Sequence, residues 1–154
     1  MILPLLGSSL GPLCYSGVMK TVLMAVAVVK DGDRVLLRKM DPAKNPYQQP
    51  WALFGGRIED DGLIVESLNK ELAGRWNFTV AITERLWWDE EAKVDQDGEE
   101  KRFVYLDTLC AVEGGQPEPV NPNEVLEWVA VADLGDYDLN PPTKILLQRL
   151  NYIG

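Results

Sequence analysis

Apolar residues alternate with short turn signals through the first third of the chain, a pattern typical of consecutive β-strands. Residues 20–30 are rich in β-branched and small apolar side chains and predict a strand. The Asp-Gly-Asp at 31–33 is a hairpin signal, and 34–39 predicts the returning strand. Three prolines in 41–50 exclude regular structure there, and a short strand over 51–54 is expected to follow.

One amphipathic helix is predicted over 63–76, because apolar residues recur there at every fourth position. These residues are Ile64, Leu68, Leu72 and Trp76. Side chains at this spacing share one face of a helix, so we expect the first three to be buried. Asp60 or Asp61 precedes the helix and is expected to cap its first turn.

Beyond this helix the pattern predicts two strands, 78–88 and 102–112, joined by an exposed acidic loop over 89–101. A last strand over 125–131 precedes a closing amphipathic helix that starts at Pro141-Pro142. We expect the inner face of this helix to carry Ile145, Leu146 and Leu150. The order of strands, helix, strands and helix predicts an α+β fold with helices on both sides of a central sheet.

The charge balance narrows the classes of partner. The 154 residues include 24 acids and 15 bases, for a formal net charge of −9. Binding to duplex nucleic acid or to an anionic membrane requires a basic surface, so we expect neither partner. A small phosphorylated ligand remains compatible, because bound cations or a few local Arg and Lys side chains can reverse the sign inside a pocket.

The sequence contains no histidine, which removes Ser-His-Asp and Cys-His catalysis and zinc sites built on imidazole. Proton transfer therefore has to use carboxylates, Lys, Tyr or water. Cys14 and Cys110 are the only cysteines, and two distant cysteines imply no disulfide framework. We therefore expect a reducing, cytoplasmic location.

Residues 1–18 carry no charge. A secretory signal needs a basic region before its apolar core, and the prolines and glycines of this segment argue against a membrane-spanning helix. We interpret 1–18 as an N-terminal arm or as the product of a start codon assigned too early, with Met19 opening the domain at 19–154. The alternative is a segment that packs on a neighbouring molecule.

The segment 51–78, WALFGGRIEDDGLIVESLNKELAGRWNF, resembles the Nudix box, G-x5-E-x7-R-E-U-x-E-E-x-G-U, in which U is apolar. The hairpin before it, the Trp before its Gly-Gly pair and Glu127-Trp128-Val129 also fall where this family has them. The similarity covers most of 19–150. It implies a MutT-like Nudix fold, an α/β/α sandwich with a mixed central sheet.

An intact box has a simple physical basis. Residues at i, i+3 and i+4 are neighbours on a helix, so the acids of R-E-x-x-E-E share one face and can hold a divalent metal ion. Mg²⁺ or Mn²⁺ then neutralises the diphosphate of a nucleotide-type substrate and helps to make a water molecule nucleophilic.

This chain keeps part of the box. Gly56 matches the opening glycine, and Glu59 matches a frequent extra acid of the loop. Glu71 is retained, with the apolar Leu72 behind it. These residues keep the strand-loop-helix junction of the motif and one of its four glutamates.

The other box positions differ from the family pattern. Gly62 replaces the first glutamate, Lys70 replaces the arginine, and Gly74 and Arg75 replace the paired acids. Asn77 stands in place of the late glycine. Because three of the four glutamates are missing, the resemblance implies a degenerate box.

The resemblance implies Glu71 as the catalytic acid. The metal ligands would be Glu59, Glu71 and a backbone carbonyl near Gly56, and we expect Mg²⁺ or Mn²⁺ to bind weakly and together with substrate. Glu124 and Glu127 lie where some relatives have an additional acid, and Glu127 is expected to be structural.

The candidate substrate-binding residues are three cations and one aromatic residue. Arg57, Lys70 and Arg75 could contact phosphate, and Trp87 could stack on a nucleobase. Each has a structural alternative: Arg75 could be only an exposed i,i+4 partner of Glu71, and Trp87 could belong to the core.

These expectations lead to two functional hypotheses. The first is a divergent, Mg- or Mn-dependent Nudix-type pyrophosphatase. Its substrate would be a nucleoside diphosphate linked to another moiety: a nucleotide sugar, a dinucleotide or a nucleoside triphosphate. The second is a catalytically inactive nucleotide-binding or interaction module. The expected partner is a small nucleotide-type molecule, and a homodimer is an open alternative to a monomer.

Overall fold

The computed structural model describes residues 18–59 and 61–154. The elements in chain order are β1 (Thr21–Asp31), β2 (Arg34–Lys39), β3 (Trp51–Ala52), β4 (Phe54–Arg57), α1 (Ile64–Trp76), β5 (Phe78–Val94), β6 (Glu100–Gly115), β7 (Val125–Ala130), the 3-10 helix η3 (Val131–Asp136) and α2 (Pro141–Arg149). The predicted order of strands and helices is confirmed. The bounds of β2 are those expected from the hairpin signal before it.

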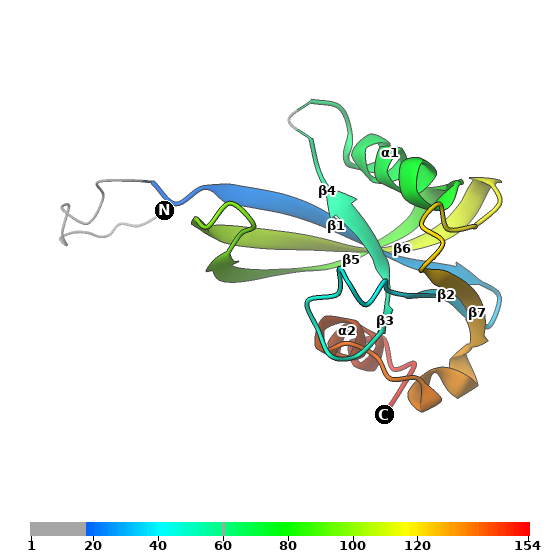
Figure 1. Cartoon of the computed structure of the whole chain (residues 1–154). Coiled ribbons are helices and arrows are strands. Elements are labelled where there is room, and N and C mark those ends of the chain that lie inside the picture. Colours follow the sequence, from blue (N-terminus) through cyan, green and yellow to red (C-terminus); the bar gives the residue numbers. More distant parts are fainter. Residues whose placement is uncertain (1–17, 60) are drawn as a thin grey trace.

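The central sheet is mixed, as predicted. Its strands follow the order β3-β2-β1-β6-β5, while β4 pairs with β1 and β7 with β2. Strands β1 and β6 run parallel, from Thr21 opposite Arg102 to Val29 opposite Cys110, and the other pairs are antiparallel. Helix α1 lies on one side of the sheet and α2 on the other (Figure 1), so the α/β/α sandwich is confirmed.

The core under α1 is aromatic. Leu68, Leu72 and Trp76 pack against Phe54 of β4 and Phe78 of β5, and all five are at most 1% exposed. Phe54 meets the rings of Trp76 and Phe78 edge to face, at centroid distances of 4.9 and 5.5 Å. Burial of each such side chain contributes about 1.5–3 kcal/mol to the free energy of unfolding, and this contribution holds α1 on the sheet next to β4.

The prediction that Ile64 is buried is wrong, since its side chain is 39% exposed. A four-residue spacing advances 400° rather than 360°, so over the three steps from Trp76 back to Ile64 the stripe drifts by about 120° around the helix. Asp61 does not cap α1: the N-cap is Leu63, whose N–H donates to Glu66 Oε1 at 2.8 Å. The alternative cap, Asp60, lies outside the described residues.

The closing helix α2 starts at Pro141, as predicted, and Asn140 Oδ1 accepts a hydrogen bond from Thr143 N at 3.1 Å to cap it. Its inner face carries Leu146 and Leu147, while Ile145 is 56% exposed. The prediction for Ile145 is therefore wrong. Thr143, Leu146 and Leu147 lie at positions i, i+3 and i+4 and are buried. Ile145, the position before Leu146, points to solvent.

The predicted acidic loop over 89–101 is also wrong. Strands β5 and β6 stay paired as far as Val94 and Glu100, so only a short turn joins them. Lys101 Nζ lies 2.8 Å from Asp95 Oδ2, and this ion pair joins the turn to the second strand. Neutralisation of an acid by a basic residue from the adjacent strand allows the charged segment to be regular.

Residues 1–17, and with them Cys14, lie outside the described residues. The boundary between an arm at 1–18 and a domain at 19–154 therefore stays a proposal. Cys110 is buried. Among the residues that the structure describes, no helix is both long and apolar enough to cross a membrane.

Candidate active site

The junction between β4 and α1 forms the centre of the candidate site. A Cβ atom on Gly55 would lie 2.6 Å from the carbonyl oxygen of Ala25 on β1. One on Gly56 would lie 2.7 and 2.8 Å from Cγ and Cβ of Glu71. Both positions thus require glycine, and the closeness of Gly56 places Glu71 directly against the strand. The structure brings together these two predicted site residues.

Arg75 lies between two carboxylates. Its Nη1 is 3.8 Å from Glu71 Oε1, one turn earlier on α1, and its Nη2 is 4.0 Å from Glu124 Oε2. Arg75 and Glu71 are partly exposed, with 48% and 34% of their side chains accessible, whereas the Glu124 side chain is 5% exposed. The i,i+4 pairing expected for Arg75 is present, but it is one side of a larger cluster.

Glu124 anchors this cluster from the end of the loop before β7. Its Oε1 accepts a hydrogen bond from Trp76 Nε1 at 2.9 Å, and its Oε2 accepts one from Arg38 Nη1 at 3.2 Å. Arg38 also donates from Nε to the Leu53 carbonyl at 2.8 Å. Burial lowers the pKa of Arg38 to about 10, although Glu124 opposes this effect. Both oxygens of the buried Glu124 carboxylate therefore accept a hydrogen bond.

Both arginines of this cluster lie over the Trp76 ring. The guanidinium carbons of Arg75 and Arg38 lie 4.3 and 5.0 Å from its centroid. Sequence analysis did not identify Arg38, because a basic residue at the end of a strand carries no signal of its own. Glu127, expected to be structural, accepts a hydrogen bond from the Tyr137 hydroxyl at 2.6 Å and takes no part in this cluster.

Glu59 and Lys70 form a separate exposed pair. Lys70 Nζ lies 3.8 Å from Glu59 Oε1, with 77% and 57% of the two side chains accessible. The backbone N–H of Glu59 donates to Ser67 Oγ at 3.0 Å, which holds the loop onto α1. Glu59 is thus near the helix, but a lysine rather than a second acid is its partner.

Arg57 is engaged by the β5–β6 hairpin. Its Nη2 donates to Asp95 Oδ1 at 2.8 Å. Hydrogen bonds from Lys101, then from the backbone N–H of Gln96 and from Arg57, hold the pKa of Asp95 far below its usual range. A phosphate bound by Arg57 would have to compete with this carboxylate.

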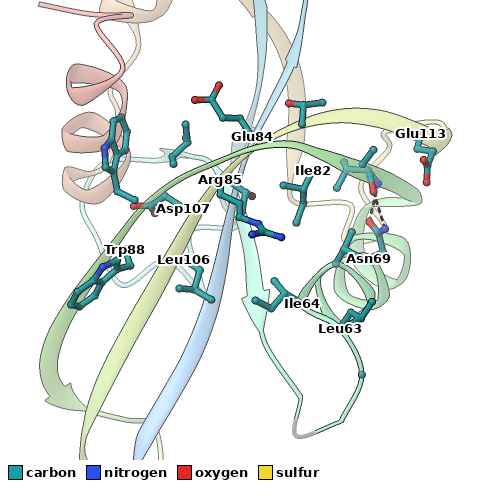
Figure 2. A pocket seen from close by; sticks show the side chains of 18 residues that line it. Leu63, Ile64, Asn69, Ile82, Glu84, Arg85, Trp88, Leu106, Asp107 and Glu113 are labelled. Carbon is teal, nitrogen blue, oxygen red and sulfur yellow. Dashed lines mark hydrogen bonds between the residues drawn. The ribbon is translucent and has the colours of Figure 1, made fainter. Parts of the chain in front are cut away.

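Trp87 lies in a groove of about 1250 Å³ along β5 and the start of α1. Figure 2 shows this groove, with Trp88 and Asp107 towards one end and Leu63 and Ile64 towards the other. Trp87 is 38% exposed, so it is not a core residue, and Arg149 lies over its ring at 5.3 Å. None of the residues of the cluster around Glu71 lines this groove.

A second cleft, of about 510 Å³, is lined by residues that are next to members of that cluster in the sequence. It is lined by Lys39, next to Arg38, and by Asn123 and Val125, which flank Glu124. The proline-rich loop predicted at 41–50 forms its other wall. Neither Arg38 nor Arg75 lines this cleft.

The carboxylates do not fit a resident divalent metal ion. Among residues 18–59 and 61–154, no group of three or more acidic, Cys or His residues is placed to hold one. Lys70 pairs with Glu59 and Arg75 with Glu71, so cations already neutralise the two predicted acidic metal ligands. A Mg²⁺ site needs several oxygen ligands with little competing positive charge.

Comparisons with known proteins show which family the chain is similar to. A family model described as "NUDIX domain" matches residues 19–150. Nucleoside triphosphatase NudI of Escherichia coli O17:K52:H18 (strain UMN026 / ExPEC) is 30% identical over 128 residues, 79% of this chain and 90% of that protein. NudI of Klebsiella pneumoniae (strain 342) is 27% identical over 129 residues, 79% of this chain and 91% of that protein.

Solved structures show the same fold. A Nudix hydrolase from Nitrosomonas europaea superposes with a TM-score of 0.64 at 13% identity, covering 86% of this chain and 88% of that one. A MutT Nudix hydrolase from Burkholderia pseudomallei gives 0.59 at 22% identity, covering 85% and 98%. The motif, the sandwich and the matched length together show that the chain belongs to the Nudix family of hydrolases.

Proposed function

We propose that this Nudix hydrolase cleaves a phosphoanhydride bond of a nucleoside triphosphate, with nucleotide sugars and dinucleotides as the other members of the substrate class. The observation that carries the proposal is the packing of Glu71 on Gly56 at the strand-helix junction of the box. The relatives named nucleoside triphosphatase, which align over 79% of the chain, favour the triphosphate within that class.

Glu71 is the proposed catalytic residue. The chain has no histidine, so a carboxylate is the natural acceptor for the proton of an attacking water molecule. Glu71 is partly exposed, so water and substrate can reach its carboxylate. Arg75 and Lys70 are the proposed phosphate ligands, since both lie on α1 with accessible side chains.

The remaining predicted residues keep narrower roles in the proposal. Arg57 binds phosphate only when it leaves Asp95, and Trp87 stacks on a base only if the substrate extends into the β5 groove. Because the carboxylates do not form a metal site, the Mg²⁺ or Mn²⁺ expected for the family would arrive on the substrate phosphates. Glu59, Glu71 and the Gly56 carbonyl then stay proposed contacts of that ion. A cytoplasmic location and a homodimer also remain proposals.

The test is a product assay on the full chain. Nucleoside triphosphates, nucleotide sugars and dinucleotides are incubated with Mg²⁺ or Mn²⁺, and released phosphate or pyrophosphate is measured. Glu71→Gln should lower kcat by about 10²-fold, the usual scale for loss of an acid-base group. The helix should keep its stability, because Gln and Glu have nearly equal helix propensities.

Glu90→Gln is the matched control, because Glu90 is exposed on β5, away from α1, and makes the same charge change. It should leave kcat and KM unchanged. Absence of turnover on every substrate class, or a Glu71→Gln variant as active as the parent, would refute the proposal.

A nucleotide-binding module without turnover is the second candidate. The specific observation in its favour is that lysine and arginine neutralise the two acids expected to hold metal. In that case nucleotides would raise Tm in a concentration-dependent manner while no product forms.

A further inference from the structure

The Arg75 guanidinium lies between two carboxylates, and this position limits which ligand the site can bind. Glu71 approaches one edge at 3.8 Å and Glu124 the other at 4.0 Å. Two carboxylates that converge from different elements on one point are an arrangement that usually holds a cation. Here the cation is a side chain of the protein itself.

We propose that Arg75 is a built-in counter-cation that occupies the position of a divalent metal ion, so that the protein binds the phosphates of a nucleotide without metal. The identification of the ligand as a nucleotide rests on the proposed function. The exclusion of metal rests only on the contacts of Arg75 and can be tested independently.

The neighbours of Arg75 fix it in this position. Its guanidinium lies 4.3 Å from the centroid of the Trp76 ring, and Trp76 Nε1 in turn holds Glu124 at 2.9 Å. Arg38 donates to the second oxygen of Glu124 at 3.2 Å. The carboxylate of Glu124 is thus held by two donors, and the oxygen that Arg38 bonds is also the one nearest to Arg75.

The charges of the cluster are balanced. Glu71 and Glu124 contribute two negative charges, and Arg38 and Arg75 contribute two positive charges. A divalent cation placed here would meet two guanidinium groups with no excess of carboxylate, which is an unfavourable site. An anion with several oxygen atoms, by contrast, could accept hydrogen bonds from Arg75.

Arg75 can still bind a ligand. Both of its ion-pair distances exceed the length of a hydrogen bond, so its N–H donors are not committed to these carboxylates. Half of its side chain is accessible to solvent. The planar fork of a guanidinium can donate to two oxygens of one phosphate group, which gives the site a preference for phosphate over an anion with a single acceptor atom.

Two measurements on the full chain test the proposal. Free Mn²⁺ is titrated by its electron paramagnetic resonance signal, and binding of the α,β-methylene analogues of the four common nucleoside triphosphates is followed by calorimetry. The parent chain should bind no Mn²⁺ below the millimolar range. It should bind its preferred analogue with affinities that agree within about threefold in EDTA and in Mg²⁺, as expected when an arginine supplies the charge.

Arg75→Gln should reverse both properties. Removal of the guanidinium leaves Glu71 and Glu124 facing each other, so Mn²⁺ should bind at least about tenfold more tightly. Analogue binding in EDTA should weaken by about tenfold or more. Adding Glu71→Gln to this variant should abolish the new Mn²⁺ affinity. Arg75→Lys, which keeps the charge but not the fork, should still exclude Mn²⁺.

Arg34→Gln is the control, since Arg34 is exposed at the β1–β2 hairpin, lines neither the β5 groove nor the second cleft, and should change neither titration. The proposal is overturned if the parent chain binds the analogues only with Mg²⁺, if Arg75→Gln gains no Mn²⁺ affinity, or if it keeps the parent's analogue affinity in EDTA. Failure of the proposed function gives a different result, namely metal-independent analogue binding with no hydrolysis of any substrate. Hydrolysis together with strictly Mg²⁺-dependent binding refutes only the present inference.

Discussion

The substitution Asp107→Asn should make the protein more stable at alkaline pH. Asp107 lies on β6 in the wall of the β5 groove, its residue is 5% exposed, and its Oδ2 has no hydrogen-bond partner. Burial, followed by the neighbouring Asp89 carboxyl group, raises the pKa of Asp107 from 3.8 to about 7. Arg149, which pairs with Asp89 at 3.2 Å, opposes the rise only in part.

The sign of the effect follows from proton binding. Between pH 3.8 and about 7 the folded protein keeps a proton on Asp107 that the unfolded chain has lost. Protonated Asp107 therefore adds its full contribution to the free energy of unfolding below about pH 4. This contribution falls as pH rises from there and is lost above about 7. At 1.36 kcal/mol for each pH unit the loss is ~4 kcal/mol at most, and solvent in the open groove reduces it to about 2 kcal/mol.

Asparagine has the shape of the protonated acid and no charge. Urea unfolding at pH 8 should give Asp107→Asn a free energy of unfolding about 2 kcal/mol above that of the parent, or a Tm higher by roughly 4–8 °C. At about pH 3, where the parent keeps the proton on Asp107 in both the folded and the unfolded state, the two proteins should agree within about 0.5 kcal/mol. The control is Asp33→Asn, at an exposed turn position. Equal or lower stability of Asp107→Asn at pH 8 would show that Asp107 is ionised in the folded protein at little cost.

Three further changes test other parts of the fold. Gly56→Ala places a methyl group within 2.8 Å of Glu71 Cβ. It should lower the free energy of unfolding in urea by about 1–3 kcal/mol and reduce turnover, and parent-like values of both would refute the close contact. Trp76→Phe removes the donor to the buried Glu124, and a loss of about 1–3 kcal/mol is expected, whereas an unchanged stability would mean that water replaces the indole. A chain that starts at Met19, where the family match begins, should melt within a few degrees of the full chain; a large drop in Tm would show that the preceding residues stabilise the domain.

Local pattern was enough for most of the secondary structure. The prediction for 34–39 coincides with β2, and the predicted helix over 63–76 differs from α1 by one residue. Turn residues and a periodic apolar face act over a few neighbouring positions, so their signal is contained in the segment itself. The local pattern did not predict the acidic hairpin, because contacts across the hairpin stabilise it. One of them is the ion pair of Lys101 with Asp95.

The motif also placed part of the site. The resemblance to the box assigned Gly56 and Glu71 to one site, and the structure packs one on the other. Spacing along a helix likewise put Arg75 one turn from Glu71, where the ion pair is found. Both results depend on the regular geometry of a single strand-helix junction, which short-range sequence determines.

Only the tertiary structure decided the chemistry around that junction. Arg38 and Glu124 are 86 positions apart, and Trp76 is 48 positions from Glu124, yet the three share one hydrogen-bonded group. No periodicity links such residues, because their contact depends on the pairing of β2 with β7 and on the packing of α1 against the sheet. The sequence by itself therefore determined the family, the sandwich and the loss of the box acids. The fold alone determined that Arg75 lies between Glu71 and Glu124, since that depends on groups from three elements that converge on one buried carboxylate.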